Sequence, residues 1–222
     1  MTVSRTDAVA LTMIAAMVGV GAIAWPGAPD EVPTLWSAWQ ESPRTTSRFW
    51  GLFGLPVTAA VIWGLFVSLP LVDPRREHYF TFRHPLAVVR TAIIAGFFAA
   101  QLFAVATIRA GRTEPRIAMP IIVGVLMVII GNYAPKIQSN WFFGIRTPWT
   151  LTSEESWRRT HRLAGWLFVT GGTVVLLTAF SHPDAARRTI FLTLIPTIVI
   201  STVYSYLVWR GDRRTTAAEG GN

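Results

Sequence analysis

Residues 163–180 read LAGWLFVTGGTVVLLTAF, an apolar run without a single ionisable side chain. A helix rises about 1.5 Å per residue, so a run of this length crosses most of a hydrocarbon core roughly 30 Å thick. Runs of similar character occupy five other stretches of the chain, at about 8–25, 49–72, 88–108, 117–131 and 190–209. The pattern predicts an all-α polytopic membrane protein with about six transmembrane helices.

The composition supports this fold class and excludes several chemistries. Only 14% of the 222 residues are charged, whereas soluble domains carry roughly a quarter. The sequence has no cysteine, which excludes disulfides, thiolate metal ligands and a cysteine nucleophile. The net charge is +8, but the basic residues lie mostly at the ends of apolar runs. We therefore expect contact with the lipid bilayer and no binding of nucleic acid.

The orientation follows from where the basic residues lie. About two thirds of the 20 Lys and Arg residues fall on the side that would hold both termini. The positive-inside rule then predicts an N-in and C-in topology. The first run has a second interpretation, because Arg5 and the segment Ala22-Ile23-Ala24 are also typical of a cleaved signal peptide.

Ionisable side chains are missing from the interiors of the predicted spans. Arg90 and Arg109 lie near span ends, where their side chains are expected to snorkel to the interface. Gln101 is expected to form a hydrogen bond between helices. Because ion-coupled transporters bind their ions with ionisable groups at membrane depth, the pattern disfavours a pump. The four histidines lack metal-ligand spacing and no catalytic motif appears, so we predict no metal, no cofactor and no enzyme activity.

One loop on the predicted inner side is much longer than the others. Residues 131–162 read GNYAPKIQSNWFFGIRTPWTLTSEESWRRTHR. The first half is rich in aromatic and turn residues, which is typical of a segment lying in the membrane interface. The second half predicts a helix that begins with a capping box of Thr152 and Glu155 and continues into the span at 163–180. Two acid–base pairs four residues apart favour this helix, Glu154 with Arg158 and Glu155 with Arg159.

Arg146 lies within this loop between Gly144 and Pro148, in a turn that we expect to be rigid and walled by aromatic residues. A cation held in that way can clamp a carboxylate or a lipid phosphate. The alternative is an interfacial segment with aromatic anchors and no binding role. His161 and Trp157 fall on the face predicted to point into the bundle, where we expect the histidine to be structural.

The loop and its flanks, over roughly 120–180, resemble the SdpI family of bacterial membrane immunity proteins. The matching segments are Gly131-Asn132-Tyr133, Pro135-Lys136, Asn140, Phe143 to Leu151, Ser153-Glu154-Glu155, Trp157 and Thr160-His161-Arg162. The resemblance implies a protein of the bacterial cytoplasmic membrane that protects its cell from a secreted peptide toxin. The family's best-described member is also a receptor that draws a cytoplasmic repressor to the membrane when toxin is bound. The resemblance therefore implies a signalling role for this chain, with a cytoplasmic repressor as a candidate partner.

The resemblance also nominates the candidate site residues, all of them in the loop. They are Asn132, Tyr133, Pro135, Lys136, Asn140, Gly144, Ile145, Arg146, Thr147, Pro148, Trp149, Thr150, Glu154, Glu155, Trp157, Thr160, His161 and Arg162.

The chain divides into three predicted parts. Residues 1–110 form an N-terminal three-helix region that weakly resembles a domain of unknown function found in the same family. Its segment Pro29-Asp30-Glu31-Val32-Pro33-Thr34-Leu35-Trp36 is similar to the family pattern, with Leu35 in place of a histidine. Residues 111–214 form the SdpI-like domain, with its motif loop at 132–162. Residues 215–222 are expected to be a disordered tail.

Three functions remain open from the sequence. The leading hypothesis is a membrane immunity or receptor protein that confers resistance to a peptide toxin. A transporter or exporter of a small amphipathic molecule is the alternative, against which the missing charges within the spans count. A lipid-modifying membrane enzyme is the third, and no residue pattern nominates its catalyst.

Overall fold

The computed structural model describes residues 4–33, 45–110 and 117–219, and of residues 214–219 it describes the backbone alone. Positions 34–36, which complete the N-terminal family-like segment, lie outside these ranges. The α-helices are α1 (Arg5–Ala24), α2 (Arg48–Val72), α3 (Tyr79–Ala110), α4 (Ala118–Tyr133), α5 (Pro148–Thr152), α6 (Glu154–Ser181) and α7 (Pro183–Glu219). Short 3₁₀ turns are η1 (Trp25–Gly27), η3 (Arg76–His78) and η4 (Ala134–Lys136). The strands β1 (Glu31–Pro33) and β2 (Thr45–Ser47) form an antiparallel pair.

Six of the described helices are long and apolar enough to cross a membrane, namely α1, α2, α3, α4, α6 and α7. The predicted fold class is therefore confirmed. The helices extend beyond the predicted spans, most of all α7, which covers Pro183–Glu219, while α3 begins early at Tyr79 and α6 at Glu154. The N-in and C-in orientation stays a prediction.

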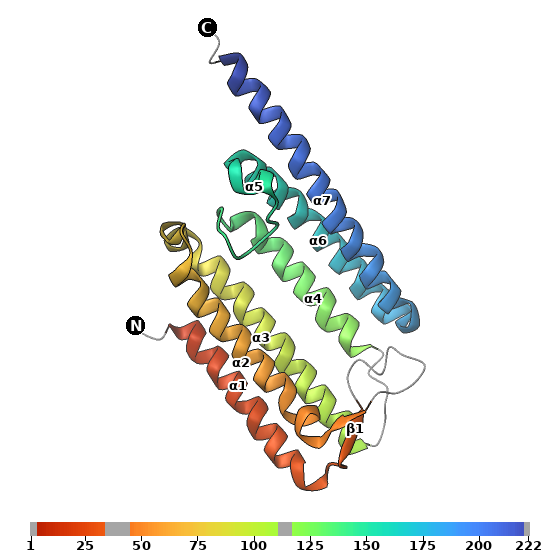
Figure 1. The fold of residues 1–222 in the computed structure, drawn as a ribbon. Coiled ribbons are helices and arrows are strands. Elements are labelled where there is room, and N and C mark those ends of the chain that lie inside the picture. Colours follow the sequence, from red (N-terminus) through yellow and green to blue (C-terminus); the bar gives the residue numbers. More distant parts are fainter. Residues whose placement is uncertain (1–3, 34–44, 111–116, 220–222) are drawn as a thin grey trace.

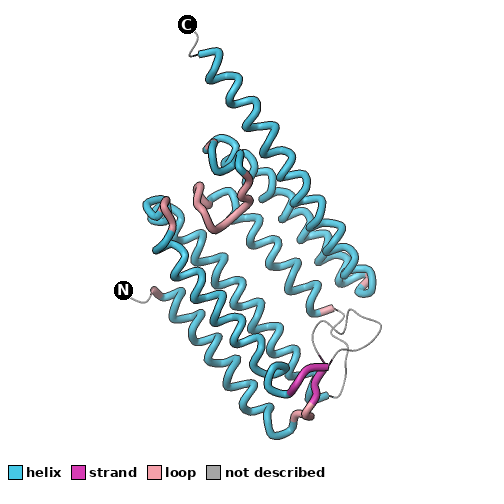
Figure 2. The backbone as a smooth tube through the Cα atoms, viewed as in Figure 1, coloured by secondary structure: helices cyan, strands magenta, loops and turns pink. Residues whose placement is uncertain are grey.

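The helices form two neighbouring groups. Helices α1, α2 and α3 run side by side, and α4, α6 and α7 pack together, with α3 against α4 between the groups (Figure 1). The start of α1, the α2–α3 connection, the motif loop and the end of α7 lie at one end of the bundle. The β1–β2 pair and the α6–α7 turn lie at the other end, as the tube in Figure 2 shows.

Glycines bring α4 and α6 into backbone contact. A Cβ on Gly131 would lie 2.7 Å from the carbonyl oxygen of Gly165, and a Cβ on Gly172 would lie 2.7 Å from that of Gly124. Small residues allow membrane helices to approach this closely, and van der Waals packing then holds them. Gly172 therefore serves helix packing, and the motif loop between these helices is anchored at both ends.

Polar contacts inside the first helix group confirm one expectation and correct another. Gln101 is fully buried and donates to the Leu52 carbonyl at 2.8 Å, an interhelical hydrogen bond as predicted. Arg90 was expected to snorkel to the interface, but it is 8% exposed and its Nη2 lies 2.5 Å from Asp7 Oδ1 of α1. An acidic partner on a neighbouring helix lets the guanidinium stay inside the bundle.

The chain also differs from expectation at its C-terminal end. Helix α7 continues through residues 215–219 of the stretch for which the sequence predicts disorder. Residues 220–222 lie outside the described part. The long helix projects past the other elements at the end that carries the motif loop (Figure 1).

Candidate functional site

The motif loop, residues 132–162, folds around the side chain of Asn140, which is completely buried. Asn140 Oδ1 accepts hydrogen bonds from the backbone N–H groups of Phe142 at 2.9 Å and Phe143 at 2.6 Å. Its Nδ2 donates to the carbonyls of Gln138 at 2.9 Å and Phe143 at 3.1 Å. An amide side chain has both an acceptor and donors. Both groups of Asn140 bond the backbone of the loop, so this one residue holds the loop closed.

The α2–α3 connection holds this loop from the side. Asp73, 3% exposed, accepts from the Trp141 N–H at 2.9 Å and from the Tyr79 hydroxyl at 2.7 Å. Arg75 donates to the Ser139 hydroxyl and, at 2.7 Å, to a carbonyl further along the loop. Asp73 and Arg75 lie more than 60 positions from their partners in the motif loop, and sequence reasoning missed them. The signal was the polar stretch at 73–79, directly after an apolar run.

Gly144, Trp157 and His161 form the tightest part of the site. Gly144 has φ of +107°, and a Cβ there would lie 2.3 Å from His161 Nε2. That nitrogen accepts from the Ile145 N–H at 3.0 Å, and His161 Nδ1 donates to the Trp157 carbonyl at 2.9 Å. The ring is therefore neutral, with its proton on Nδ1. It stacks on the Trp157 indole at 4.0 Å between ring centroids, so His161 points into the bundle, as predicted.

A short helix then connects the loop to α6 and α7. Thr147 caps α5 by accepting from the Thr150 N–H at 3.2 Å, and Thr150 Oγ1 accepts in return from the Thr147 N–H at 2.9 Å. The Thr147 hydroxyl also lies 3.0 Å from that of Ser205 in α7. The Ser156 hydroxyl donates to the Ser205 carbonyl at 2.8 Å. Both ends of the α5–α6 segment are thus fixed against α7.

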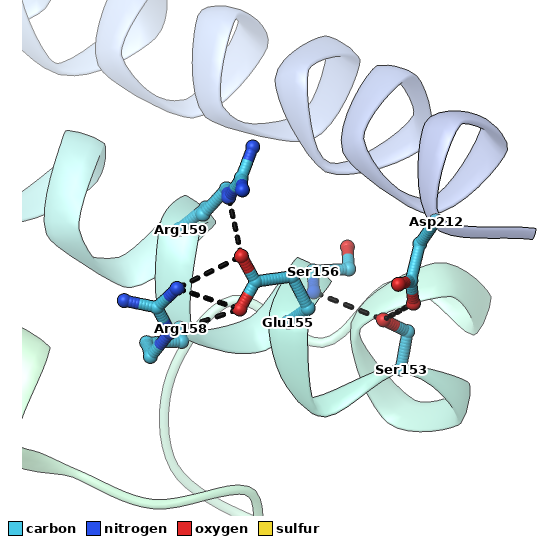
Figure 3. Close-up of polar contacts among 6 residues, drawn as sticks. All are labelled: Ser153, Glu155, Ser156, Arg158, Arg159 and Asp212. Carbon is cyan, nitrogen blue, oxygen red and sulfur yellow. Dashed lines mark hydrogen bonds and ion pairs between the residues drawn. The ribbon is translucent and has the colours of Figure 1, made fainter. Parts of the chain in front are cut away.

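The predicted cap of α6 at Thr152 is wrong. The backbone leaves the helical region at Ser153, with φ of −135° and ψ of 121°, so Ser153 is the cap and accepts from the Ser156 N–H at 3.0 Å. Its hydroxyl donates to Asp212 of α7 at 2.7 Å, as Figure 3 shows. Thr152 belongs to α5, where its hydroxyl donates to the Pro148 carbonyl at 2.7 Å.

Glu155 bonds arginines instead of completing a capping box. Its carboxylate accepts from Arg158 at 2.7–2.9 Å and from Arg159 at 2.5 Å (Figure 3). The predicted Glu155–Arg159 pair is confirmed. The predicted Glu154–Arg158 pair is wrong, because Arg158 forms its ion pair with Glu155, three residues before it. Glu154 is exposed.

Arg146 is exposed, and its Nη1 donates to the Trp141 carbonyl at 2.8 Å. One nitrogen thus fixes the guanidinium, and its other donors have no partner within the described residues. Trp149 packs against Tyr206 of α7 at 5.2 Å between ring centroids, edge to face. Lys136 Nζ lies 4.4 Å from the centroid of the Tyr133 ring.

The candidate residues separate by exposure. The buried ones, which hold the loop, are Asn140, Thr147, Thr150, Trp157, Thr160 and His161. Those at intermediate depth are Tyr133, Ile145, Trp149 and Glu155. The exposed ones are Asn132, Pro135, Lys136, Gly144, Arg146, Pro148, Glu154 and Arg162.

A pocket of about 480 Å³ lies beside the loop, between η4 and the first turn of α6. Its lining includes His78, Lys136, Glu154 and Arg158, so it offers charges of both signs. Within the described ranges, no three His, Asp or Glu side chains gather closely enough to hold a metal ion. The site suits recognition of a polar or charged segment.

Comparison with known proteins supports this view of the chain. Residues 136–208 match the SdpI/YfhL protein family, and residues 12–60 match a domain of unknown function (DUF1648). The chain is 24% identical over 178 residues to the immunity protein SdpI of Bacillus subtilis (strain 168), covering 80% of this chain and 83% of that protein. No solved structure matches. The predicted resemblance is confirmed, and with six apolar helices the chain is a multi-pass cell-membrane protein.

Proposed function

We propose that the chain is a membrane immunity protein that confers resistance to a peptide toxin, with the exposed side of the motif loop as its recognition surface. The similarity to an immunity protein over most of both chains supports the class of function. The main support for this surface is the exposure of Arg146. This cation lies on a turn whose buried hydrogen-bonding groups are satisfied within the protein.

A preorganised cation binds an anionic partner without first losing side-chain freedom. Nη1 of Arg146 is held by the Trp141 carbonyl, which leaves Nε and Nη2 as a fork for a carboxylate. In the predicted orientation this surface faces the cytoplasm. The partner we propose for it is therefore a carboxylate that the loop must bind at the cytoplasmic face for protection, and signalling to a cytoplasmic regulator would use the same loop.

The test is survival of a sensitive bacterium that expresses the chain and is challenged with a panel of secreted membrane-active peptides. We expect Arg146→Ala and Arg146→Lys both to weaken protection by tenfold or more, because losing a fork-type contact to a charged partner costs roughly 2–5 kcal/mol. Lysine keeps the charge but not the bidentate geometry. Arg76→Ala is the control, since Arg76 is exposed at the same end of the bundle.

Membrane levels of each variant are measured by immunoblot, so that loss of protein is separated from loss of function. If both Arg146 variants protect as well as the parent at equal levels, the motif loop is not the recognition surface. If the parent itself gives no protection against any peptide of the panel, the immunity proposal is overturned.

A transporter of a small amphipathic molecule is the second candidate. It is favoured by a cavity of about 610 Å³ between α1, α2 and α3, lined by Leu11, Phe66 and Leu86 and by the ion pair of Asp7 with Arg90. The survival assay separates the two proposals. An exporter would protect through this cavity, so Arg90→Gln would abolish resistance and Arg146→Ala would leave it intact.

A further inference from the structure

A groove of about 460 Å³ lies between α6 and α7, close to the end of the bundle that carries the motif loop. Its lining is Arg158, Arg159, Arg162, Leu163 and Trp166 from α6 and Tyr204 from α7. We propose that this arginine groove binds the phosphate of an anionic phospholipid. Arg158, Arg159 and Arg162 belong to the C-terminal part of the motif loop, but the inference does not rest on the immunity proposal, because it concerns another class of ligand and does not involve Arg146.

The charge in the groove is not neutralised by the protein. Glu155 is shared between two guanidiniums, those of Arg158 and Arg159 (Figure 3). Arg162 is exposed and has no ion pair within the described part of the chain. Three cations therefore stand against one carboxylate, and an anion entering the groove gains charge-assisted hydrogen bonds.

Glu155 also arranges the donors. Arg159 gives only Nε to the carboxylate, which leaves both of its terminal nitrogens for another acceptor. Arg158 gives Nε and Nη2 and keeps Nη1. The two side chains are held in place before any ligand arrives, so less side-chain entropy is lost on binding.

The far end of the groove identifies the phosphate as that of a lipid. Trp166 is 65% exposed and Tyr204 lies beside it in the lining, as aromatic side chains do at membrane interfaces. Along the same face of α6, Leu177 and Phe180 are exposed. Cations, aromatic rings and then apolar side chains follow one another in the order of a phospholipid headgroup, glycerol and acyl chains.

The test compares purified full-length protein in discs of phosphatidylcholine with protein in discs that also contain phosphatidylglycerol. Native mass spectrometry counts the bound lipid, and thermal unfolding reports its effect on stability. We expect retained phosphatidylglycerol and a higher Tm in the second disc. Arg162→Gln should weaken phosphatidylglycerol binding about tenfold, which corresponds to the loss of one hydrogen bond between charged groups. Arg210→Gln removes the same charge from exposed α7 surface outside the groove and should have no such effect.

Four results overturn the proposal. One is equal binding of phosphatidylcholine, which would show that the charge of the headgroup is not recognised. Another is equal weakening of binding by Arg210→Gln and Arg162→Gln, which would indicate nonspecific surface charge. Inorganic phosphate could raise the Tm as much as the lipid does, which would indicate a site for free anions. A short acidic peptide could displace phosphatidylglycerol, which would indicate a protein partner. Trp166→Leu provides a second check that keeps all three cations, and it should lower lipid retention without changing the response to inorganic phosphate.

Discussion

Gly144 lies where the motif loop passes over the His161 ring, and its φ of +107° belongs to the left-handed region that L side chains rarely adopt. A methyl group there would meet His161 Nε2 at 2.3 Å and would displace the Ile145 N–H from it. Although Gly144 is exposed in the folded chain, we therefore do not expect it to tolerate substitution by a residue with a side chain. Its neighbours Ile145 and Arg146 depend on this one turn for their direction.

We predict that Gly144→Ala destabilises the folded protein by about 2 kcal/mol or more, since backbone strain and an unpaired N–H each cost of order 1–3 kcal/mol. Thermal unfolding in detergent, followed by size-exclusion chromatography, gives the change in Tm. Gly64→Ala in α2 is the matched control, because no atom lies within 4 Å of its added Cβ. Equal Tm values for the two variants would contradict the steric argument.

At the scale of elements, the motif loop and the α2–α3 connection behave as one unit. Asp73 Oδ2 accepts from the Trp141 N–H of the loop and from the Tyr79 hydroxyl, and His78 Nδ1 lies 2.7 Å from the Ser139 carbonyl. The two helix groups of the bundle are thus connected by hydrogen bonds as well as by packing of α3 on α4. Any movement of the loop has to change these bonds.

A double-mutant cycle tests this unit. Asp73→Asn should destabilise the protein by about 1–3 kcal/mol, and Tyr79→Phe by about 1 kcal/mol, because buried partners are left unpaired. Since the two side chains share one hydrogen bond, the combined loss should fall short of the sum by about 0.5 kcal/mol or more. Chemical unfolding in mixed micelles measures each value, with Glu77→Gln, exposed in η3, as the control. Strict additivity would show that the contact contributes nothing.

These elements also show what the sequence could predict. Apolar runs placed all six long helices, because burial in lipid depends on local composition. Helical periodicity also predicted correctly that Trp157 and His161 lie on the face of α6 that points into the bundle. The contacts of Asp73 with Trp141 and of Arg90 with Asp7 could not be predicted, since these partners lie tens of residues away, in the motif loop and on α1. The cap at Ser153 was missed because the break between α5 and α6 is set by packing on α7.

The candidate site was predicted only as a stretch of sequence. The resemblance nominated eighteen residues without indicating that Asn140 is buried and Arg146 exposed, because burial here depends on how the loop folds back on α3 and α6. Tertiary contacts therefore divide the motif into a scaffold and a surface. Because of that division, the Arg146 variants test protection, whereas the Gly144 variant tests the stability of the fold.

At the scale of the whole molecule, both ends of the described chain and the motif loop lie at one end of the bundle, whereas the α6–α7 turn lies at the other (Figure 1). An even number of spans requires this arrangement in either orientation. The distribution of Lys and Arg selects one of the two, with the motif loop inside. The recognition surface proposed for Arg146 depends on that choice, because only an inward loop meets a cytoplasmic regulator.

Single cysteines decide the orientation, since the native chain contains none and the background is clean. Gln138 is exposed in the motif loop and Ser181 is exposed at the opposite end of α6. We predict that Gln138→Cys reacts with a membrane-impermeant thiol reagent only after lysis, whereas Ser181→Cys reacts in intact cells. Both are small changes at exposed positions, so each variant should reach the membrane at the parent level, which an immunoblot checks. The reverse labelling pattern would place the loop outside, where it would meet the toxin directly instead of an intracellular partner.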